Sequence, residues 1–343
     1  MKQLIWLLFL TGILALCTAC TGCEPMTSLE EKNITFSIAA YNVQEFFDAV
    51  DDGCEYEEFR KKNYWSKEVY ELRLGRLCQV IRALKAEIIV LEEIENEAVL
   101  QDIVNMLSGD SWRESQQYNF SCFAKEPGSA IGIGVLSRFP LSGLCLHSMD
   151  IRTQLENQPS IRPIMQVQAD ENGRKLHIFC NHWKSKSGGK EKTEIWREWQ
   201  ESVLSEQLLK ASKREEMFTA VLCGDFNRDI KEFKILGNGA EGFGKVLMRT
   251  SDPITETFNT VGVISPWLDE KGAIQGSTGS YYYNGEWERI DHMFLYGKGE
   301  IKSFSVISNG EWANENGIPL GFKIYTGSGY SDHLPLRMTV KFK

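Results

Sequence analysis

The feature that most constrains the fold of this chain is a pairing that occurs six times. A short apolar run, of the kind that forms a buried β-strand, stands beside a small cluster of acidic, amide or imidazole side chains. Polar groups repeated at the ends of six strands describe a site rather than scattered surface residues. The clusters are Tyr41-Asn42-Val43, Leu91-Glu92-Glu93-Ile94, Asn181-His182-Trp183-Lys184-Ser185, Gly224-Asp225-Phe226-Asn227, Glu288-Arg289-Ile290-Asp291-His292 and Ser331-Asp332-His333.

The chemistry of these clusters indicates a hard cation and a phosphate. Oxygen ligands suit Mg²⁺, Mn²⁺ or Ca²⁺, and Glu93 directly follows an apolar strand; the alternative is an ordinary surface glutamate. Asp225 and Asn227 are two positions apart on an extended chain, so their side chains point the same way. They face one phosphate, or they close an Asx turn.

Two histidines lie in clusters and carry the acid–base hypothesis. Imidazole is the usual general base near neutral pH, and Asp291 can orient the ring of His333. His182 is suited to bind a phosphate oxygen or protonate a leaving oxygen. His147 and His177 are interpreted as structural, and His292 is expected to point away from Asp291.

The spacing of apolar residues predicts a layered α/β domain with mixed sheets. No interior linker divides it. Long irregular segments are expected at 48–66, 108–128, 231–285 and 308–330, where they would rim the site. Helices are predicted over 66–85, 97–107 and 193–214, and strands over 35–41, 86–91, 131–136, 164–169, 176–181, 220–223, 289–296 and 336–342.

The N-terminus is typical of an exported bacterial protein. A lysine precedes an apolar run that ends near Leu16, and small residues then precede Cys20 and Cys23. This predicts a signal or lipoprotein leader over 1–23, with lipid on Cys20 or Cys23, and a tether over 24–34. The expected location is a membrane-anchored lipoprotein in the periplasm or at the cell surface. Plain secretion and a retained anchor are the alternatives.

Taken together, the clusters resemble the endonuclease/exonuclease/phosphatase superfamily, the deoxyribonuclease-like group. The resemblance covers 35–343 as one catalytic domain and follows the family's motif order, and the runs around Glu93 and His182 look closest to exported bacterial nucleases. Glu92 stands where the family usually has glutamine. The resemblance implies a four-layer α/β/β/α sandwich with two packed mixed β-sheets.

The resemblance also implies a divalent metal site and a phosphate site. Asn42 and Glu93 would hold the metal, Mg²⁺ or else Mn²⁺ or Ca²⁺, with Asp332 completing the site or binding a second ion. Arg162 is a further phosphate contact, or else a surface arginine.

Roles in the reaction follow from the same resemblance. Asp225 and Asn227 would position the water and the phosphate, with His333, oriented by Asp291, as general base. Asp225 is the rival base. His182 would bind phosphate and assist the leaving group. The glutamate that orients this first histidine in the deoxyribonuclease pattern has no identified counterpart here.

The resemblance leaves the substrate open among phosphoric esters. An exported nuclease is the first interpretation, and a monomer is expected. The formal net charge of −9 argues against a global basic field for nucleic acid, but Lys184, Lys186, Lys190 and Lys192 suggest a local basic strip, and Tyr281-Tyr282-Tyr283 and Trp287 suggest stacking.

Three alternatives remain. A phospholipid or sphingomyelin phosphodiesterase would use Val261–Leu268 as an apolar loop, an inositol-phosphate-type phosphatase would need a dense basic cluster, and a non-catalytic surface binding module would use the fold as a scaffold.

Overall fold

The computed structural model describes residues 34–108, 116–149, 158–237, 242–251 and 258–342. The chain divides into two compact units, Met1–Asn33 and Ile34–Lys343. The predicted leader and the lipidation sites Cys20 and Cys23 lie outside the described residues. Everything below concerns the second unit. None of its described helices is long and apolar enough to cross a membrane.

Two large mixed sheets form the centre of this unit. The six-stranded sheet has the order β15-β16-β1-β2-β4-β3, and the eight-stranded sheet has the order β5-β6-β7-β8-β14-β11-β10-β9. One pair in each is parallel, β1 with β2 and β7 with β8, and the other pairs are antiparallel. The strands of the first sheet are β1 (Thr35–Phe46), β2 (Ile88–Ile94), β3 (Phe120–Ala124), β4 (Gly132–Ser137), β15 (Gly299–Val306) and β16 (Leu336–Phe342). Those of the second are β5 (Leu141–His147), β6 (Ile164–Glu171), β7 (Arg174–His182), β8 (Thr219–Asp225), β9 (Lys234–Leu236), β10 (Phe243–Ser251), β11 (Phe258–Asp269) and β14 (Asp291–Gly297).

Strand β1 shows why the sheets pack in layers. Its residues alternate in direction, so Ile38 and Ala40 join the core between the sheets, and Ala39 and Tyr41 join the core beneath the helices. Both faces are buried. The near-continuous apolar sequence of β1 is what a strand covered on both sides requires.

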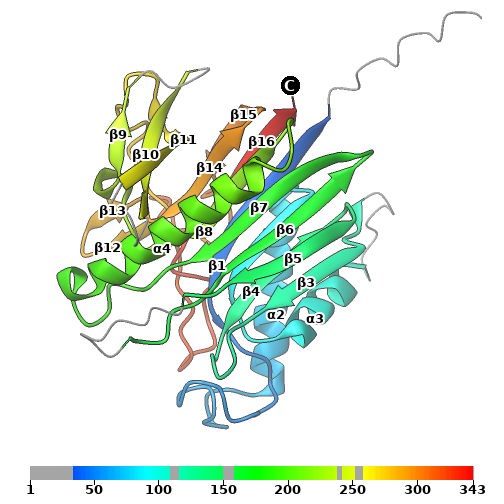
Figure 1. Cartoon of the computed structure of the whole chain (residues 1–343). Helices are drawn as coiled ribbons and strands as arrows, with labels where there is room; N and C mark the ends of the chain where they lie inside the picture. The colour runs from blue at the N-terminus through cyan, green and yellow to red at the C-terminus, as the bar shows by residue number, and fades with distance from the viewer. Residues whose placement is uncertain (1–33, 109–115, 150–157, 238–241, 252–257, 343) are drawn as a thin grey trace, which may run out of the picture. The chain divides into compact units, whose positions relative to one another are not determined.

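Helices cover the outer faces (Figure 1). Helix α2 (Lys67–Leu84) begins at Ser66, whose side chain accepts a hydrogen bond from the Val69 amide. It packs with α3 (Glu97–Ser108) in the core cluster of the six-stranded sheet. Helix α4 (Lys190–Ser212) covers the eight-stranded sheet with Leu204 and Leu208. The predicted four-layer α/β sandwich is confirmed.

Some predicted loops contain regular structure. Segment 231–285 holds the end of the 3₁₀ turn η2 (Ile230–Glu232), then β9, the hairpin of β10 and β11, and β12 (Tyr281–Tyr283), which pairs with β13 (Glu286–Glu288). Segment 108–128 holds β3. Val261–Leu268, the candidate apolar loop of the phospholipid alternative, belongs to β11 and buries Val263 and Trp267. Interruptions by glycine, asparagine and polar residues hid these strands.

Candidate active site

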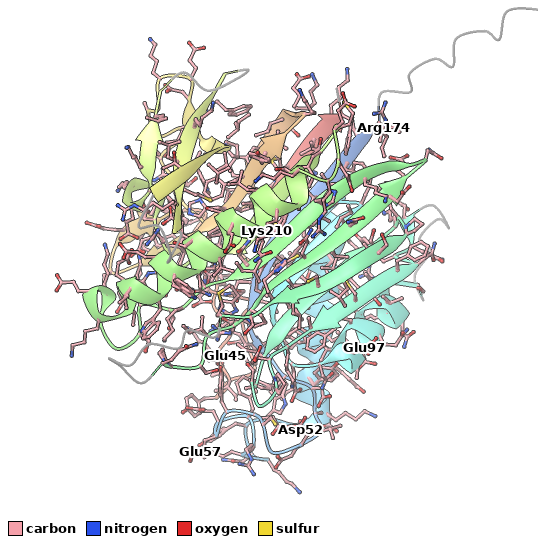
Figure 2. All side chains as sticks on the ribbon, viewed as in Figure 1. Glu45, Asp52, Glu57, Glu97, Arg174 and Lys210 are labelled. Atoms are coloured by element: carbon pink, nitrogen blue, oxygen red, sulfur yellow. The ribbon has the colours of Figure 1, made fainter. Side chains whose placement is uncertain are left out.

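The sheet registers bring the sequence clusters to one end of the sandwich. Asp225 at the end of β8 lies opposite His182 of β7 on one side and Asp291 of β14 on the other. In the other sheet β1 and β2 end together, with Asn42 opposite Glu92. In Figure 2, Glu45 lies at this end and Arg174, where β7 begins, lies at the opposite end.

Asn42 links the two sheets across the site. Its amide nitrogen donates to Glu93 Oε1 at 3.1 Å and to Asp225 Oδ2 at 3.2 Å. Its oxygen accepts from the Gln44 amide at 3.0 Å, which fixes the orientation of the side chain. Strands from separate sheets are thereby joined by one buried amide.

Unusual backbone conformations aim the acidic groups. Glu93 and Asn227 have positive φ angles of 67° and 48°, which side chains other than glycine adopt only at a cost. Gly224 has a φ of 121°, and a Cβ atom there would lie 2.1 Å from the Asn181 carbonyl oxygen. Only glycine fits between β7 and β8 just before Asp225.

Arg73 of α2 fixes the backbone that follows Asn42. Its buried guanidinium donates to the carbonyls of Val43, Gln44 and Glu45. The Glu45 amide in turn donates to Glu93 Oε2 at 2.6 Å. A buried arginine outside the clusters therefore holds the carboxylate of Glu93 in place.

Asp225 and Asn227 form a compact hydrogen-bonded turn. Asp225 Oδ1 accepts from the Asn227 amide at 2.7 Å, and Oδ2 accepts from the Asn227 side chain at 2.9 Å. Asn227 also donates to the Trp183 carbonyl at 3.2 Å. Burial, followed by the charge of Asp291, raises the pKa of Asp225 to about 7. This carboxyl group can exchange a proton near neutrality.

His333 and Asp291 form a buried ion pair at the cleft. His333 Nδ1 lies 2.8 Å from Asp291 Oδ2, and Asp291 is held by the Ser280 hydroxyl through its amide at 3.2 Å. Burial disfavours the imidazolium, but the charges of Asp291, Asp332 and Asp225 outweigh it and raise the pKa of His333 well above its usual value. The geometry favours a protonated ring with Nε2 free of hydrogen bonds to described residues.

The pKa of His182 is shifted in the opposite direction from that of His333. Its Nε2 lies 3.4 Å from Glu93 Oε1 and 3.8 Å from Asp225 Oδ2, while its buried Nδ1 has no partner among the described residues. Burial and then the charge of Arg162 hold its pKa well below the usual range. No described glutamate orients this ring through Nδ1.

A cleft of about 680 Å³ opens over these groups. Arg162, Ser185 and Lys186 line it together with Glu93, His182, Asp225, Asn227 and His333, whereas Asn42 and Asp291 are not among its lining residues. The rings of Tyr281 and Tyr283 also line it and stack on each other at 6.2 Å with an interplanar angle of 16°. The opening is polar, large enough for a phosphate and its neighbouring groups, and flanked by aromatic rings.

Several predicted features take a different position. Asp332 is not among the residues that line the cleft. Burial raises the pKa of Asp332, the charge of His333 lowers it by a smaller amount, and the charge of Glu93 adds to the increase. The lysine strip is partly neutralised, because Lys186 pairs with Glu288 at 2.7 Å and Lys190 pairs with Glu232.

The other histidines lie outside the cleft lining. His177 contacts Glu215 at 3.0 Å, and His147 contacts Gln166 at 2.9 Å. His292 is buried against Phe294 and lies 2.8 Å from the Arg228 carbonyl oxygen, and burial lowers its pKa to about 4.

Sequence reasoning missed Glu45 and Tyr56, both of which line the cleft. Burial, then repulsion from Glu93, raises the pKa of Glu45 to about 7. Glu45 lies three residues after Asn42, but its placement depends on the positive φ of 51° at this residue, which no sequence pattern signalled. Tyr56 lies in an irregular segment without periodicity.

The donor set fits a divalent metal. Glu93 and Asp225 bring carboxylate oxygens to the same Asn42 side-chain nitrogen, and neither carboxylate forms an ion pair with a described lysine or arginine. Clustered acidic groups without a counter-cation are suited to one, so the residues present agree with metal binding.

Comparison with known proteins defines the class. The model of the Endonuclease/Exonuclease/phosphatase family matches residues 37–341. The chain belongs to this family of phosphoric ester hydrolases, whose enzymes typically use divalent metals. No curated protein gives a significant match to the sequence.

Solved structures show the same fold at low sequence identity. Truncated TDP2 from Caenorhabditis elegans has a TM-score of 0.55 and 13% identity, covering 90% of this chain and 98% of that one. TDP2 from D. rerio, crystallised with a single-strand DNA product, has a TM-score of 0.53 and 15% identity, with coverages of 90% and 99%. A family protein from Bacteroides thetaiotaomicron has a TM-score of 0.50 and 13% identity, with coverages of 91% and 99%.

Proposed function

We propose that this protein is a divalent-metal-dependent phosphodiesterase that hydrolyses nucleic-acid phosphodiester bonds. The observation that carries the proposal is the meeting of Asn42, Glu93, Asp225, His182 and the Asp291–His333 pair at one cleft, as the site geometry above describes. A metal-binding carboxylate, a proton acceptor and cationic or neutral imidazole donors are the groups that phosphoryl chemistry needs.

The chain's own groups divide the reaction between them. Asp225, whose pKa is about 7, accepts a proton from the attacking water, and Asn227 orients that water and the phosphate. His333 remains an imidazolium beside Asp291 and donates Nε2–H to a phosphate oxygen. We therefore assign the base role to Asp225 rather than to His333, choosing between the two candidates by the electrostatics of the pair.

Neutral His182, whose Nε2 lies 3.4 Å from Glu93 Oε1, hydrogen-bonds a phosphate or leaving oxygen. Arg162 adds a positive charge at the cleft wall. Glu93 and Asp332 would hold the divalent metal, and Asn42 orients Glu93 through the hydrogen bond from its side-chain nitrogen. That ion, Mg²⁺ in the first instance, supplies Lewis-acid stabilisation of the charge that develops on the phosphoryl oxygens.

The cleft wall supports a nucleic-acid substrate. Tyr281 and Tyr283 present stacked rings beside the phosphate groups, and 56% of Tyr283 is exposed, so a base or sugar can stack there. The fold neighbour from D. rerio was crystallised with a single-strand DNA product. The phospholipid alternative requires an exposed apolar loop, but its candidate segment Val261–Leu268 belongs to strand β11. The inositol-phosphate alternative requires a dense basic cluster, but Lys186 and Lys190 form ion pairs with glutamates.

We also propose that the protein is exported and lipid-anchored through Cys20 or Cys23, and acts as a monomer. Its leader sequence supports the proposal. Partition of the expressed protein into detergent, lost in the Cys20→Ala or the Cys23→Ala variant, tests it and identifies the modified residue. If both variants still partition into detergent like the wild type, the proposal is contradicted.

The function is tested with supercoiled plasmid and single-stranded DNA and RNA, with Mg²⁺ or with EDTA. We expect metal-dependent cleavage by the wild type and a loss of at least about 100-fold in Asp225→Asn and in His333→Ala. Lys175→Ala, on the opposite end of β7 from the cleft, is the control and should cleave normally. A folded wild-type protein without nuclease activity that hydrolyses sphingomyelin or inositol phosphates instead would refute the nucleic-acid assignment.

A further inference from the structure

A second acidic cluster lies outside the cleft lining and was not among the predicted site residues. Asp52, Glu55 and Glu95 each place a carboxylate oxygen within 4.8 Å of the other two. Glu95 is fully buried and Glu55 nearly so, while Asp52 is exposed. Figure 2 shows Asp52 on the loop below Glu45.

This cluster lacks positive charge. Among the described residues, none of the three carboxylates forms an ion pair, and the nearby Arg60 pairs with Asp51 instead. Burying a carboxylate without a counter-charge is costly, and proteins resolve the cost by pairing, by protonation or by a metal ion. Two of these three carboxylates are buried.

One oxygen of the cluster has no hydrogen-bond partner within the part of the chain that the structure describes. Glu95 Oε2 accepts from the Asp48 amide at 2.5 Å, but Oε1 is buried and unpartnered. A buried orphan oxygen in a group of converging carboxylates is the position that a cation ligand would occupy. It is an observation separate from the count of acidic residues.

Backbone amides of the loop also hold the other two carboxylates in place. Glu55 accepts from the amides of Asp52 and Gly53 at 2.6 and 2.9 Å, and Asp52 Oδ1 accepts from the Cys54 amide at 2.9 Å. These bonds hold negative oxygens together without neutralising them, and each oxygen retains a lone pair for a ligand.

We propose that Asp52, Glu55 and Glu95 bind a Ca²⁺ ion that stabilises the loop between β1 and α2. Oxygen ligands at roughly 2.3–2.6 Å from one Ca²⁺ lie up to about 5 Å apart, which accommodates the observed separations of up to 4.8 Å. An exposed Asp52 leaves room for the waters that complete six to eight ligands. Mg²⁺, with its shorter bonds and stricter octahedral geometry, fits less well.

The site would connect the loop to the core and to the cleft wall. Glu95 belongs to the segment that follows β2, two residues after Glu93, and Tyr56, next to Glu55, lines the cleft. A bound ion therefore fixes the loop that carries Tyr56. The proposal concerns stability, so it stands or falls independently of nuclease activity.

The test measures thermal unfolding of the full chain with CaCl₂ or MgCl₂ as the only divalent salt, from 0.01 to about 10 mM. We expect Ca²⁺ to raise the melting temperature by about 2–5 °C. Asp52→Asn and Glu55→Gln should lose the rise. Glu57→Gln, an exposed loop carboxylate that pairs with Lys61, and Glu93→Gln, in the cleft, should retain it.

Each outcome bears on the proposal. An undiminished rise in both Asp52→Asn and Glu55→Gln would overturn it, and so would a rise lost only in Glu93→Gln, which would place the ion in the cleft. A larger rise with Mg²⁺ than with Ca²⁺ would overturn the assignment to Ca²⁺. If Glu55→Gln fails to fold, the exposed Asp52→Asn decides, and isothermal titration of that variant with Ca²⁺ should show no binding at this site.

Discussion

Replacing Asp291 with asparagine separates the two possible roles of His333. The carboxylate lies 2.8 Å from Nδ1 in a buried pair, and asparagine keeps its shape while removing the charge. A hydrogen bond to a charged group contributes about 1.5–3 kcal/mol, and each 1.4 kcal/mol is tenfold in rate. We expect kcat/KM at the pH optimum to fall by about 10–150-fold.

The pH profile shows which protonation state of His333 is active. The charge of Asp291 raises the pKa of His333 against the effect of burial, so the variant must have a lower pKa at this ring. If the imidazolium is required, activity is lost as pH rises through that pKa, and the alkaline limb of the profile moves to lower pH in Asp291→Asn. If the neutral base is required, the acidic limb moves to lower pH.

Glu215→Gln provides a matched control. Glu215 contacts His177 at 3.0 Å in a similar pair outside the cleft, so this variant should retain wild-type kinetics. The assay is initial-rate hydrolysis of a phosphodiester across pH 5–9 at saturating Mg²⁺. An Asp291→Asn enzyme with unchanged rate and both limbs in place would refute the reasoning that this pair sets the charge of the ring.

The residues of the sequence clusters come together in the structure because each cluster lies directly beside a strand. Once strands from two sheets end together, residues such as Asp225 and Asn42 meet without further information. The turn Gly224–Asn227 contains a glycine and an asparagine with positive φ angles, and these residue types adopt such angles more readily than others do. The family resemblance then supplied the roles of these residues.

Other features of the site were not readable from the sequence. The support by Arg73 depends on a helix delivering a buried guanidinium to three backbone carbonyls, a contact separated by about 28–30 positions in the chain. The pairing of Lys186 with Glu288 spans 102 positions and cancels a charge that looked free in the sequence. Hairpin β10–β11 was hidden because its alternating pattern is interrupted by polar residues.

Three further outcomes are expected. Glu92→Gln should make the protein more stable to urea than the wild type at pH 7, by on the order of 1–3 kcal/mol, but not at pH 4. Burial, and after it the neighbouring charges, raises the pKa of Glu92 in the folded protein, so the wild type loses stability as pH rises above the ordinary pKa of a glutamate. Glutamine cannot ionise, so the variant does not lose this stability. Gly224→Ala should lower the melting temperature sharply or prevent folding, at a cost of about 3 kcal/mol or more, since its Cβ would clash with Asn181; Gly173→Ala, with open space, is the milder comparison. Arg73→Met should weaken Mg²⁺ affinity about tenfold in titration calorimetry, whereas Arg174→Met should not.

The acidic character of the site has a consequence for the whole fold. Glu45, Glu93, Asp225 and Asp332 lie together at the point where both sheets end. Burial raises the pKa values of Glu45 and Asp225 to about 7, and added to it is repulsion, from Glu93 on Glu45 and from Asp291 on Asp225. A cation in the cleft relieves it in the folded state only, since the unfolded chain does not bring these groups together. Binding of a metal in the cleft would therefore be coupled to folding at this end of the sandwich, and the same argument applies to the proposed site at Asp52, Glu55 and Glu95. If Mg²⁺ fills the cleft and Ca²⁺ fills the loop site, their stabilising effects should be separable, because Glu93→Gln removes the effect of Mg²⁺ and Asp52→Asn removes that of Ca²⁺.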